Sequence, residues 1–110
     1  MTKKNLDWEN LGFEYHETDK RYIANYKDGE WEEGRLSSNS EVVINVSAAV
    51  LQYCQQVFEG LKAYTTEDGS VVTFRPDLNA ERMLKSAEGL QMPPFPKERF
   101  LEAVDQVVEA

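Results

Sequence analysis

Arg82 is the residue best placed to bind a charged ligand. It lies on a predicted helix over residues 78–91. The apolar stripe of this helix recurs at helical spacing and consists of Ala80, Met83, Leu84, Ala87 and Leu90. Arg82 lies away from the stripe, on a face with the small residues Ser86 and Gly89. Because a guanidinium donates two parallel hydrogen bonds, this face suits a phosphate group.

The alternative for Arg82 is a surface ion pair along its own helix. The residues three and four positions away on this helix are Leu78, Asn79, Lys85 and Ser86. None of them is acidic, so the local sequence offers Arg82 no partner for an ion pair along its own helix.

Lys62 is a second basic residue with a possible ligand nearby. A two-residue turn at Asp68-Gly69 would place Lys62 opposite Arg75 in a hairpin. Like charges in facing positions are unfavourable unless an acid or an anion lies close to them. A longer loop, with a shifted register and a solvated lysine, is equally consistent with the sequence.

Other chemistry is poorly represented. His16 is the only histidine and Cys54 the only cysteine, so no four-ligand zinc site can be assembled and no metal site is expected. His16 lies in a polar segment, which favours an exposed side chain over a member of a Ser/His/Asp set. No glycine-rich phosphate-binding motif occurs. The lone cysteine favours a reducing, cytoplasmic environment.

The composition excludes several classes of partner. The chain has 110 residues, with 12 basic and 20 acidic side chains and a net charge of −8. Its length allows one domain. The acidic excess is spread along the chain and leaves no basic patch, which argues against binding to nucleic acid or to an anionic membrane. The apolar run over residues 42–51 is too short to span a membrane.

The first forty residues predict an arm and a hairpin. Residues 1–20 are polar with scattered aromatic side chains and are expected to form an irregular N-terminal arm. Residues 22–26 predict a strand, Asp28-Gly29 a tight turn, and Glu30-Trp31 the start of the returning strand. Residues 34–40 are small and polar and predict a loop.

The middle of the chain predicts further strands. Residues 41–46 are rich in β-branched side chains and predict a strand. A short helical turn is expected at residues 55–59, ended by Gly60. A second hairpin is predicted from strands at residues 61–66 and 71–75.

The last third predicts two helices. Asp77 or Asn79 is expected to cap the first, and Pro93, Pro94 and Pro96 link it to a second that starts near Lys97. Strands followed by helices predict an α+β fold, with an antiparallel sheet and helices packed on one side. We expect residues 21–110 to form this small domain.

The end of the last helix is unusual. Residues 105–110 place acidic side chains at the negative end of the helix dipole and supply no glycine, asparagine or basic cap. We therefore expect the chain to stop inside a helix that continues in a longer protein. A frayed natural terminus is the alternative.

Three linked motifs carry a family resemblance. Residues 53–64 read YCQQVFEGLKAY, residues 74–87 read FRPDLNAERMLKSA, and residues 92–96 read MPPFP. In this order and spacing they resemble the branched-chain amino acid aminotransferases, which are fold-type IV enzymes that use pyridoxal 5′-phosphate. D-amino acid aminotransferases and aminodeoxychorismate lyases are related alternatives. A stand-alone self-associating or regulatory domain is an alternative of another class.

The resemblance implies that the chain is the small N-terminal domain of such an enzyme. The full-length protein would be a homodimer that moves the amino group between Leu, Ile or Val and 2-oxoglutarate. The Schiff-base lysine would lie in a large domain that this chain lacks, so the chain holds no catalytic residue and is expected to be inactive alone.

The resemblance also implies roles for individual residues. Arg82 would bind the cofactor phosphate. The substrate pocket would be lined by Tyr53, Phe58, Gly60, Lys62 and Phe13. For the three aromatic residues, the residue types alone favour an ordinary place in the hydrophobic core.

Overall fold

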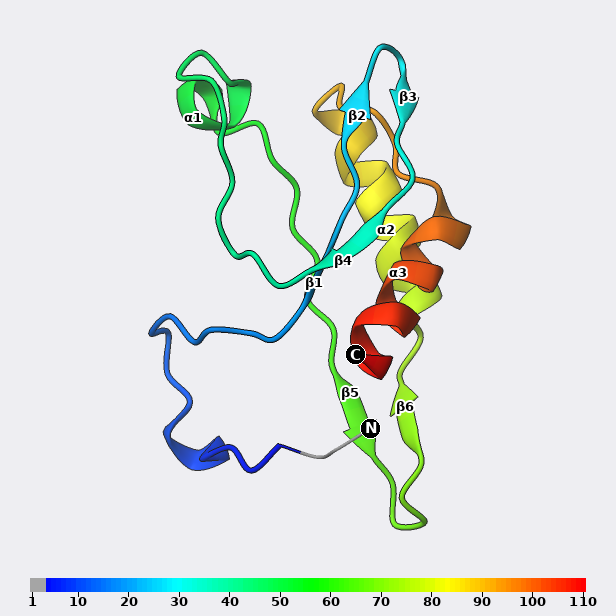
Figure 1. Ribbon diagram of the computed structural model, residues 1–110. Helices are drawn as coiled ribbons and strands as arrows, with labels where there is room; N and C mark the ends of the chain where they lie inside the picture. The colour runs from blue at the N-terminus through cyan, green and yellow to red at the C-terminus, as the bar shows by residue number, and fades with distance from the viewer. Residues whose placement is uncertain (1–3) are drawn as a thin grey trace.

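The computed structural model describes residues 4–110, so the first three residues of the predicted arm lie outside it (Figure 1). A 3₁₀ turn, η1, lies in the N-terminal segment at Trp8–Asn10. The strands are β1 (Arg21–Ile23), β2 (Tyr26–Lys27), β3 (Glu30–Trp31), β4 (Arg35–Ser37), β5 (Ala63–Thr65) and β6 (Val71–Thr73). The helices are α1 (Ala49–Tyr53), α2 (Pro76–Gly89) and α3 (Lys97–Glu109).

The predicted α+β class is confirmed. The described strands pair in three two-stranded antiparallel ladders, β1–β4, β2–β3 and β5–β6, in place of the single sheet that was expected. Helices α2 and α3 pack on each other, and α3 also contacts β1. Figure 1 shows the two helices side by side next to the first hairpin.

The first hairpin forms around the predicted turn. Asp28 and Gly29 both have positive φ angles, 52° and 83°, as a tight two-residue turn requires, and Lys27 pairs with Glu30. Further from the turn, Tyr22 pairs with Leu36. The two registers differ by one residue, which indicates a β-bulge on the returning strand.

The predicted loop over residues 34–40 is therefore wrong in part, because the bulge lets the ladder continue into β4. Gly34 has a steric role at this point. A Cβ atom on Gly34 would overlap the ring of Tyr22, which crosses the hairpin there.

The second hairpin has a longer loop than a two-residue turn. Thr65 pairs with Val71, and the backbone N–H of Thr66 donates to the carbonyl of Ser70 at 2.8 Å. Three residues thus connect the strands, with Gly69 at φ 87°. This register carries Lys62 opposite Phe74, so the predicted pairing of Lys62 with Arg75 is wrong and the longer-loop alternative is confirmed.

Two predictions for the middle of the chain are wrong. Residues 41–46 form no strand, because no described segment runs beside them to complete a ladder, and the side chain of Val43 is fully exposed. The helical turn lies at α1, ahead of the predicted residues 55–59. Cys54 adopts the left-handed conformation, φ 53°, and ends the helix there.

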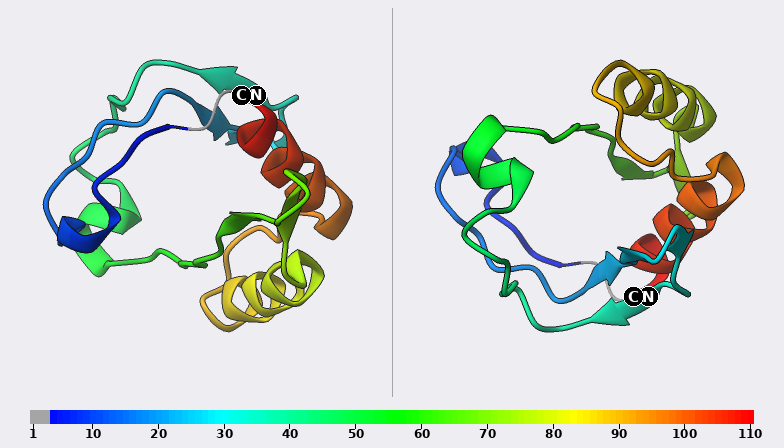
Figure 2. Two further views of the ribbon diagram at one scale, coloured as in Figure 1. Left: turned by 90° about the horizontal axis from the view of Figure 1, so that it is seen from below. Right: turned by 90° about the horizontal axis from the view of Figure 1, so that it is seen from above.

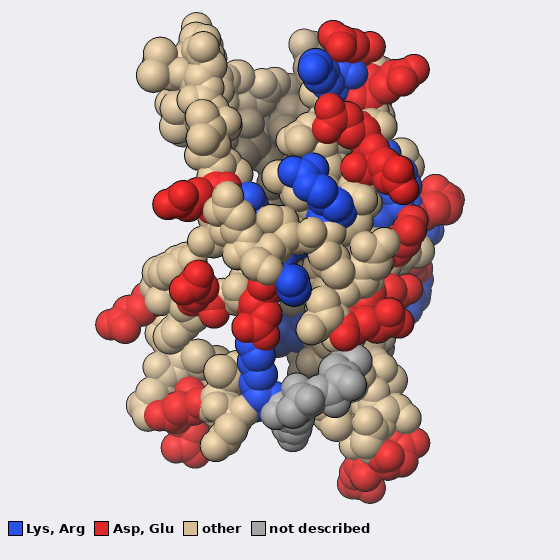
Figure 3. Space-filling view, in the orientation of Figure 1, with Lys and Arg blue, Asp and Glu red and all other residues tan. Residues whose placement is uncertain are grey.

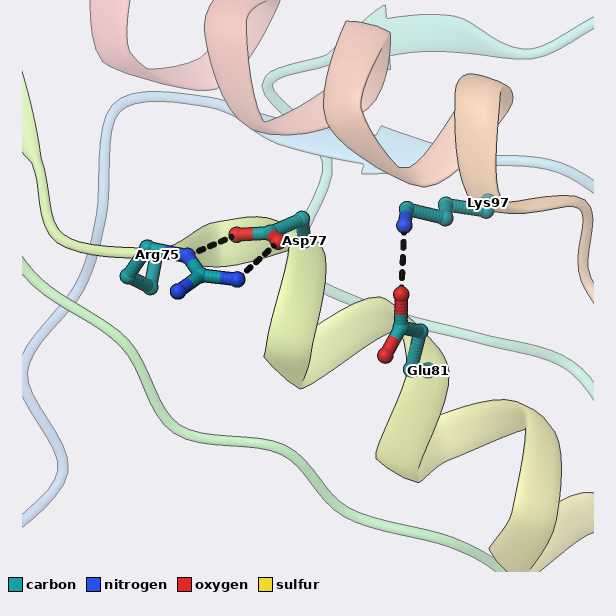
Figure 4. Close-up of polar contacts among 4 residues, drawn as sticks. All are labelled: Arg75, Asp77, Glu81 and Lys97. Atoms are coloured by element: carbon teal, nitrogen blue, oxygen red, sulfur yellow. Dashed lines mark hydrogen bonds and ion pairs between the residues drawn. The ribbon is translucent and has the colours of Figure 1, made fainter.

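The two long helices lie close to the predicted positions. Pro76 occupies the first turn of α2, where its missing N–H costs no hydrogen bond. The predicted caps are wrong, since no side chain caps this end. Asp77 instead accepts hydrogen bonds from Nε and Nη2 of Arg75, at 2.9 and 2.6 Å, and Glu81 accepts one from Lys97 of α3 at 2.6 Å (Figure 4).

The hairpin and the helices are joined through Trp31. Its indole N–H donates to the carbonyl of Pro94 at 2.8 Å, and its ring meets Phe95 edge to face at 5.0 Å. Arg99 of α3 donates from Nη2 to the carbonyl of Glu32 at 2.5 Å. We call residues 21–37 together with α2 and α3 the packed region.

The rest of the N-terminal half is open. Residues 4–20 and 38–58, which we call the open region, loop away from α2 and α3 over most of their length (Figure 2). Near its end the region returns to α2, where Nε2 of Gln55 donates to the carbonyl of Leu90 at 2.8 Å. The radius of gyration is 15.7 Å, against about 13 Å for a compact domain of this length. Ala80 and Ala87 are the only fully buried apolar residues in the described chain.

The surface of the open region around α1 carries no charge, as Figure 3 shows at the upper left. The sequence explains this, because residues 42–58 contain no acidic or basic side chain. Within residues 4–110, no helix has the length and apolar character needed to cross a membrane.

Candidate functional site

Arg82 forms a two-pronged ion pair with Glu59. Nε of Arg82 donates to Oε1 of Glu59 at 2.7 Å, and Nη2 donates to Oε2 at 2.6 Å. The two residues differ sharply in exposure. The Arg82 side chain is 68% exposed, whereas that of Glu59 is 5% exposed. The guanidinium therefore reaches outward from a carboxylate that is anchored inside.

Asn79 completes this arrangement. Its Nδ2 donates to Oε2 of Glu59 at 2.9 Å and to the carbonyl of Gly60 at 3.1 Å. Asn79 and Arg82 lie three residues apart on α2, so they share one face, and that face meets residues 59–60.

These contacts keep both partners charged. Hydrogen bonding to Arg82 is the main cause that lowers the pKa of Glu59, and the bond from Asn79 acts in the same direction against the effect of burial. The bond to Glu59 raises the pKa of Arg82 above its ordinary value. The pair is thus a carboxylate and a guanidinium at any pH near neutrality.

Helical spacing alone could not reveal this partner. Helical spacing relates Arg82 only to residues of its own helix, and Glu59 lies 23 residues earlier in the chain. One sequence signal could have pointed to it: Glu59 is the only acidic residue between Val42 and Thr66. A lone acidic residue needs a basic partner when it is buried.

The guanidinium keeps a second edge for another anion. A guanidinium has five N–H groups, and Glu59 accepts from Nε and from one N–H of Nη2. The outer edge of the guanidinium, opposite Nε, consists of one N–H group of Nη1 and the remaining N–H group of Nη2. No residue in the described range 4–110 accepts from Nη1. Because this outer edge is exposed and planar, it fits two oxygens of a phosphate group.

An apolar cavity of about 820 Å³ lies beside this site, between the first hairpin and helices α2 and α3. Glu59 and Gly60 line one side of it. Apolar side chains dominate the rest of its wall, among them Trp31, Leu61, Met83, Phe100 and Val104. The carboxylate of Glu59 is therefore backed by apolar surface on the side away from Arg82.

Of the other predicted site residues, only Gly60 lines this cavity within the described chain. Tyr53 and Phe58 are 83% and 87% exposed, Phe13 is fully exposed, and Lys62 is exposed as well. The alternative that the three aromatic residues belong to the core is therefore wrong. Gly60 has room for a Cβ atom, which would meet the Phe58 ring at an ordinary 3.5 Å.

His16 is exposed, as predicted. Cys54 is a free, exposed cysteine. The described residues thus bring together one charged site, built from Glu59, Asn79 and Arg82, and leave the predicted aromatic pocket unassembled.

Comparison with known proteins identifies relatives along nearly the whole chain. No family model matches the sequence. The chain is 52% identical over 107 residues to a branched-chain-amino-acid aminotransferase of Haemophilus influenzae, covering 97% of the chain and 31% of that protein. It is 47% identical to the corresponding enzyme of Helicobacter pylori, covering 97% of the chain and 32% of that protein.

A methionine aminotransferase of Arabidopsis thaliana is 43% identical, over 96% of the chain and 30% of that protein. The chain thus spans about 30% of the length of each of these relatives. The matched part is the N-terminal part of those proteins. The chain is therefore homologous to the N-terminal part of the branched-chain-amino-acid aminotransferases.

Proposed function

We propose that this chain is the N-terminal part of a pyridoxal 5′-phosphate-dependent transaminase that moves the amino group between branched-chain amino acids and 2-oxoglutarate. The observation that carries the proposal is the 52% identity to a branched-chain-amino-acid aminotransferase over 97% of the chain. The exposed guanidinium edge on α2 supports it independently, because such an enzyme must hold the phosphate of its cofactor.

Arg82 is the proposed phosphate ligand. Its unoccupied edge offers parallel N–H donors, its charge is secured by Glu59, and its exposure leaves the donors accessible. When bound, pyridoxal 5′-phosphate supplies an electron sink for the bond changes at the α-carbon of the substrate. This chain contributes binding and orientation to that chemistry.

The proposed substrate pocket would use residues that are dispersed over this chain. Tyr53, Phe58, Gly60, Lys62 and Phe13 would form part of its wall. Aromatic side chains suit a pocket for the branched apolar side chains of Leu, Ile and Val. Because these residues do not meet in the described chain, the rest of the protein and a second subunit of a homodimer would complete the pocket.

A chimera tests the proposed activity. This chain would replace the matching 107 residues of the Haemophilus influenzae relative. We expect the purified chimera to transfer the amino group of Leu, Ile or Val to 2-oxoglutarate, and the chain alone to show no transfer, since the proposed catalytic lysine lies outside it. The unmodified relative is the positive control.

The chimera also tests the choice of substrate. Because one relative is a methionine aminotransferase at 43% identity, methionine belongs in the same assay. Faster transfer from Leu, Ile and Val than from methionine supports the proposal. A folded chimera that binds the cofactor but transfers from none of the three branched amino acids would refute it.

A further inference from the structure

Glu59 holds Arg82 by one edge only. A carboxylate that accepts from Nε and Nη2 lies at one side of the guanidinium. The outer edge, formed by Nη1 and the second N–H group of Nη2, has no partner in the described chain, and the Arg82 side chain is exposed. The distances of 2.7 and 2.6 Å are those of strong charge-assisted hydrogen bonds. The orientation of the outer edge is therefore set by the position of Glu59.

Glu59 itself is fixed by three features. Its side chain is 5% exposed, Asn79 donates to its Oε2, and the neighbouring Gly60 carbonyl is bound by the same Asn79 amide. Lys20 and Arg21 also line the cavity that adjoins Glu59, but they donate to Ser38 and to the carbonyl of Glu41. In the described chain, Arg82 is the only basic residue bonded to the Glu59 carboxylate. The carboxylate has one basic partner and one geometry.

We propose that Glu59, with Asn79, is a positioning residue that presents the outer edge of Arg82 to a phosphate group. The inference rests on the proposed phosphate role of Arg82 and adds to it. An arginine side chain in water samples many rotamers, and a ligand must pay for ordering it. Here Glu59 has ordered it before the phosphate arrives.

The same contacts are also consistent with the opposite effect of Glu59 on phosphate binding, and an experiment can distinguish the two. Glu59 is an anion close to the proposed phosphate, so it could compete for Arg82 and weaken phosphate binding. Under that reading, removing its charge strengthens binding. Under the positioning reading, removing its charge or shortening its side chain weakens binding, because the outer edge is no longer held in place.

The first experiment measures affinity in the 110-residue chain by isothermal titration calorimetry. The probes are inorganic phosphate, pyridoxal 5′-phosphate and pyridoxal, which lacks the phosphate. We expect Glu59→Gln and Glu59→Asp each to weaken binding of both phosphate-bearing probes by about threefold to tenfold, the range of a lost or misaligned hydrogen bond. Pyridoxal binding should not change, which separates positioning from a general loss of structure.

Asp77→Asn is the matched control. Asp77 lies on the same helix and accepts from Nε and Nη2 of Arg75 in the same side-on geometry. Its loss removes an equivalent ion pair away from Arg82, so phosphate affinity should stay at the wild-type value. Circular dichroism confirms that each variant is folded.

The second experiment follows the Nε–H of Arg82 by nitrogen-15 NMR. Bonded to Glu59, this proton should exchange slowly with water and give a resolved signal, which Glu59→Gln should remove. On addition of inorganic phosphate, the signal should persist while the Nη resonances shift, because phosphate binds the outer edge.

The outcomes distinguish the inference from the proposed function. If Arg82→Ala leaves phosphate affinity unchanged, the phosphate role of Arg82 is wrong and the inference falls with it. If Arg82→Ala abolishes binding but both Glu59 variants bind as wild type does, the phosphate role stands and the positioning role is wrong. A rise in affinity in Glu59→Gln, or loss of the Nε–H signal on adding phosphate, identifies Glu59 as a competitor and overturns the inference.

Discussion

The packed region and the open region differ in how far each has built its part of the proposed active site. In the packed region, Trp31 joins the first hairpin to the chain segment between α2 and α3, and Arg82 on α2 is held by Glu59. In the open region, Phe13 and Tyr53 point into solvent with no described partner in a pocket.

This difference indicates that the proposed phosphate site and the proposed substrate pocket depend on different parts of the protein. The orientation of the proposed phosphate-binding edge of Arg82 is set by contacts within this chain. The proposed substrate pocket, with its aromatic residues, would be completed by other parts of the protein and by a second subunit. Phosphate binding should therefore be measurable in this chain by itself. Substrate binding should be measurable only in the full-length protein or in the chimera.

The largest expected effect comes from Trp31→Ala. This change removes the indole hydrogen bond to Pro94 and the contacts with Phe95 and Tyr26. We expect it to lower the free energy of unfolding by about 3 kcal/mol, as for other large-to-small changes of aromatic residues. Urea denaturation followed by circular dichroism measures it.

Phe58→Ala is the control for Trp31→Ala. Phe58 is 87% exposed, so its loss should change the free energy of unfolding by no more than about 0.5 kcal/mol. Equal losses in the two variants would show that the open region is packed as firmly as the packed region.

Self-association is the next expected effect. Large apolar side chains are exposed along the open region, including Val43, Val46, Leu51 and Tyr53. Extensive exposed apolar surface promotes association, although the net charge of −8 opposes it. Sedimentation velocity at rising concentration should show species larger than a monomer, with a larger share at high salt. A single monomer at every concentration would contradict this expectation.

A smaller effect concerns pH. Arg82 lowers the pKa of Glu59 below its ordinary value of 4.5. Because the pKa is lowered on folding, the pair stabilises the fold above pH 4.5, and this contribution is lost as pH falls through the folded-state pKa. The difference in unfolding free energy between wild type and Glu59→Gln should therefore shrink as the pH falls below 4.5.

The exposure of Arg82 keeps this pH effect modest, since water screens the pair. Asp77, whose pKa is lowered to about 2 by Arg75, gives a comparison within the same helix. A difference between wild type and Glu59→Gln that grows as pH falls would contradict the assigned direction of the Glu59 shift.

The smallest expected effect is at Cys54, in the open region. Its left-handed backbone, φ 53°, is unfavourable for a side chain and natural for glycine at a helix end. Cys54→Gly should raise the free energy of unfolding by about 0.5–1 kcal/mol. Cys54→Ala is the control, because it removes the thiol and keeps the Cβ atom. If both changes raised the free energy of unfolding equally, the gain would come from loss of the thiol and not from relief of the left-handed backbone.

The sequence predicts the local features of the fold well and the long-range ones poorly. Asp28-Gly29 determines its own turn, and the apolar stripe of α2 determines that helix, because both depend on neighbours in sequence. Residues 41–46 have strand propensity but form no strand, since a strand also needs a partner that no local pattern specifies. The bulge that extends the first hairpin into β4 was missed for the same reason.

The candidate site, too, has a local part that the sequence predicts and a long-range part that it does not. The face of Arg82 could be derived from helical spacing, but its partner Glu59 lies on another segment and is reached only through the tertiary fold. Family resemblance supplied the aromatic residues without their surroundings. Their exposure, which the structure shows, was not encoded in any local pattern.

The most direct test of the central account is the affinity of the chain for pyridoxal 5′-phosphate in Arg82→Ala and Arg75→Ala. Both arginines are exposed and bind a carboxylate through Nε and Nη2, but only Arg82 lies at the proposed phosphate site. We predict that Arg82→Ala weakens binding by about tenfold or more, with partial recovery in Arg82→Lys, and that Arg75→Ala leaves it unchanged. Equal affinities in Arg82→Ala and Arg75→Ala would contradict the account.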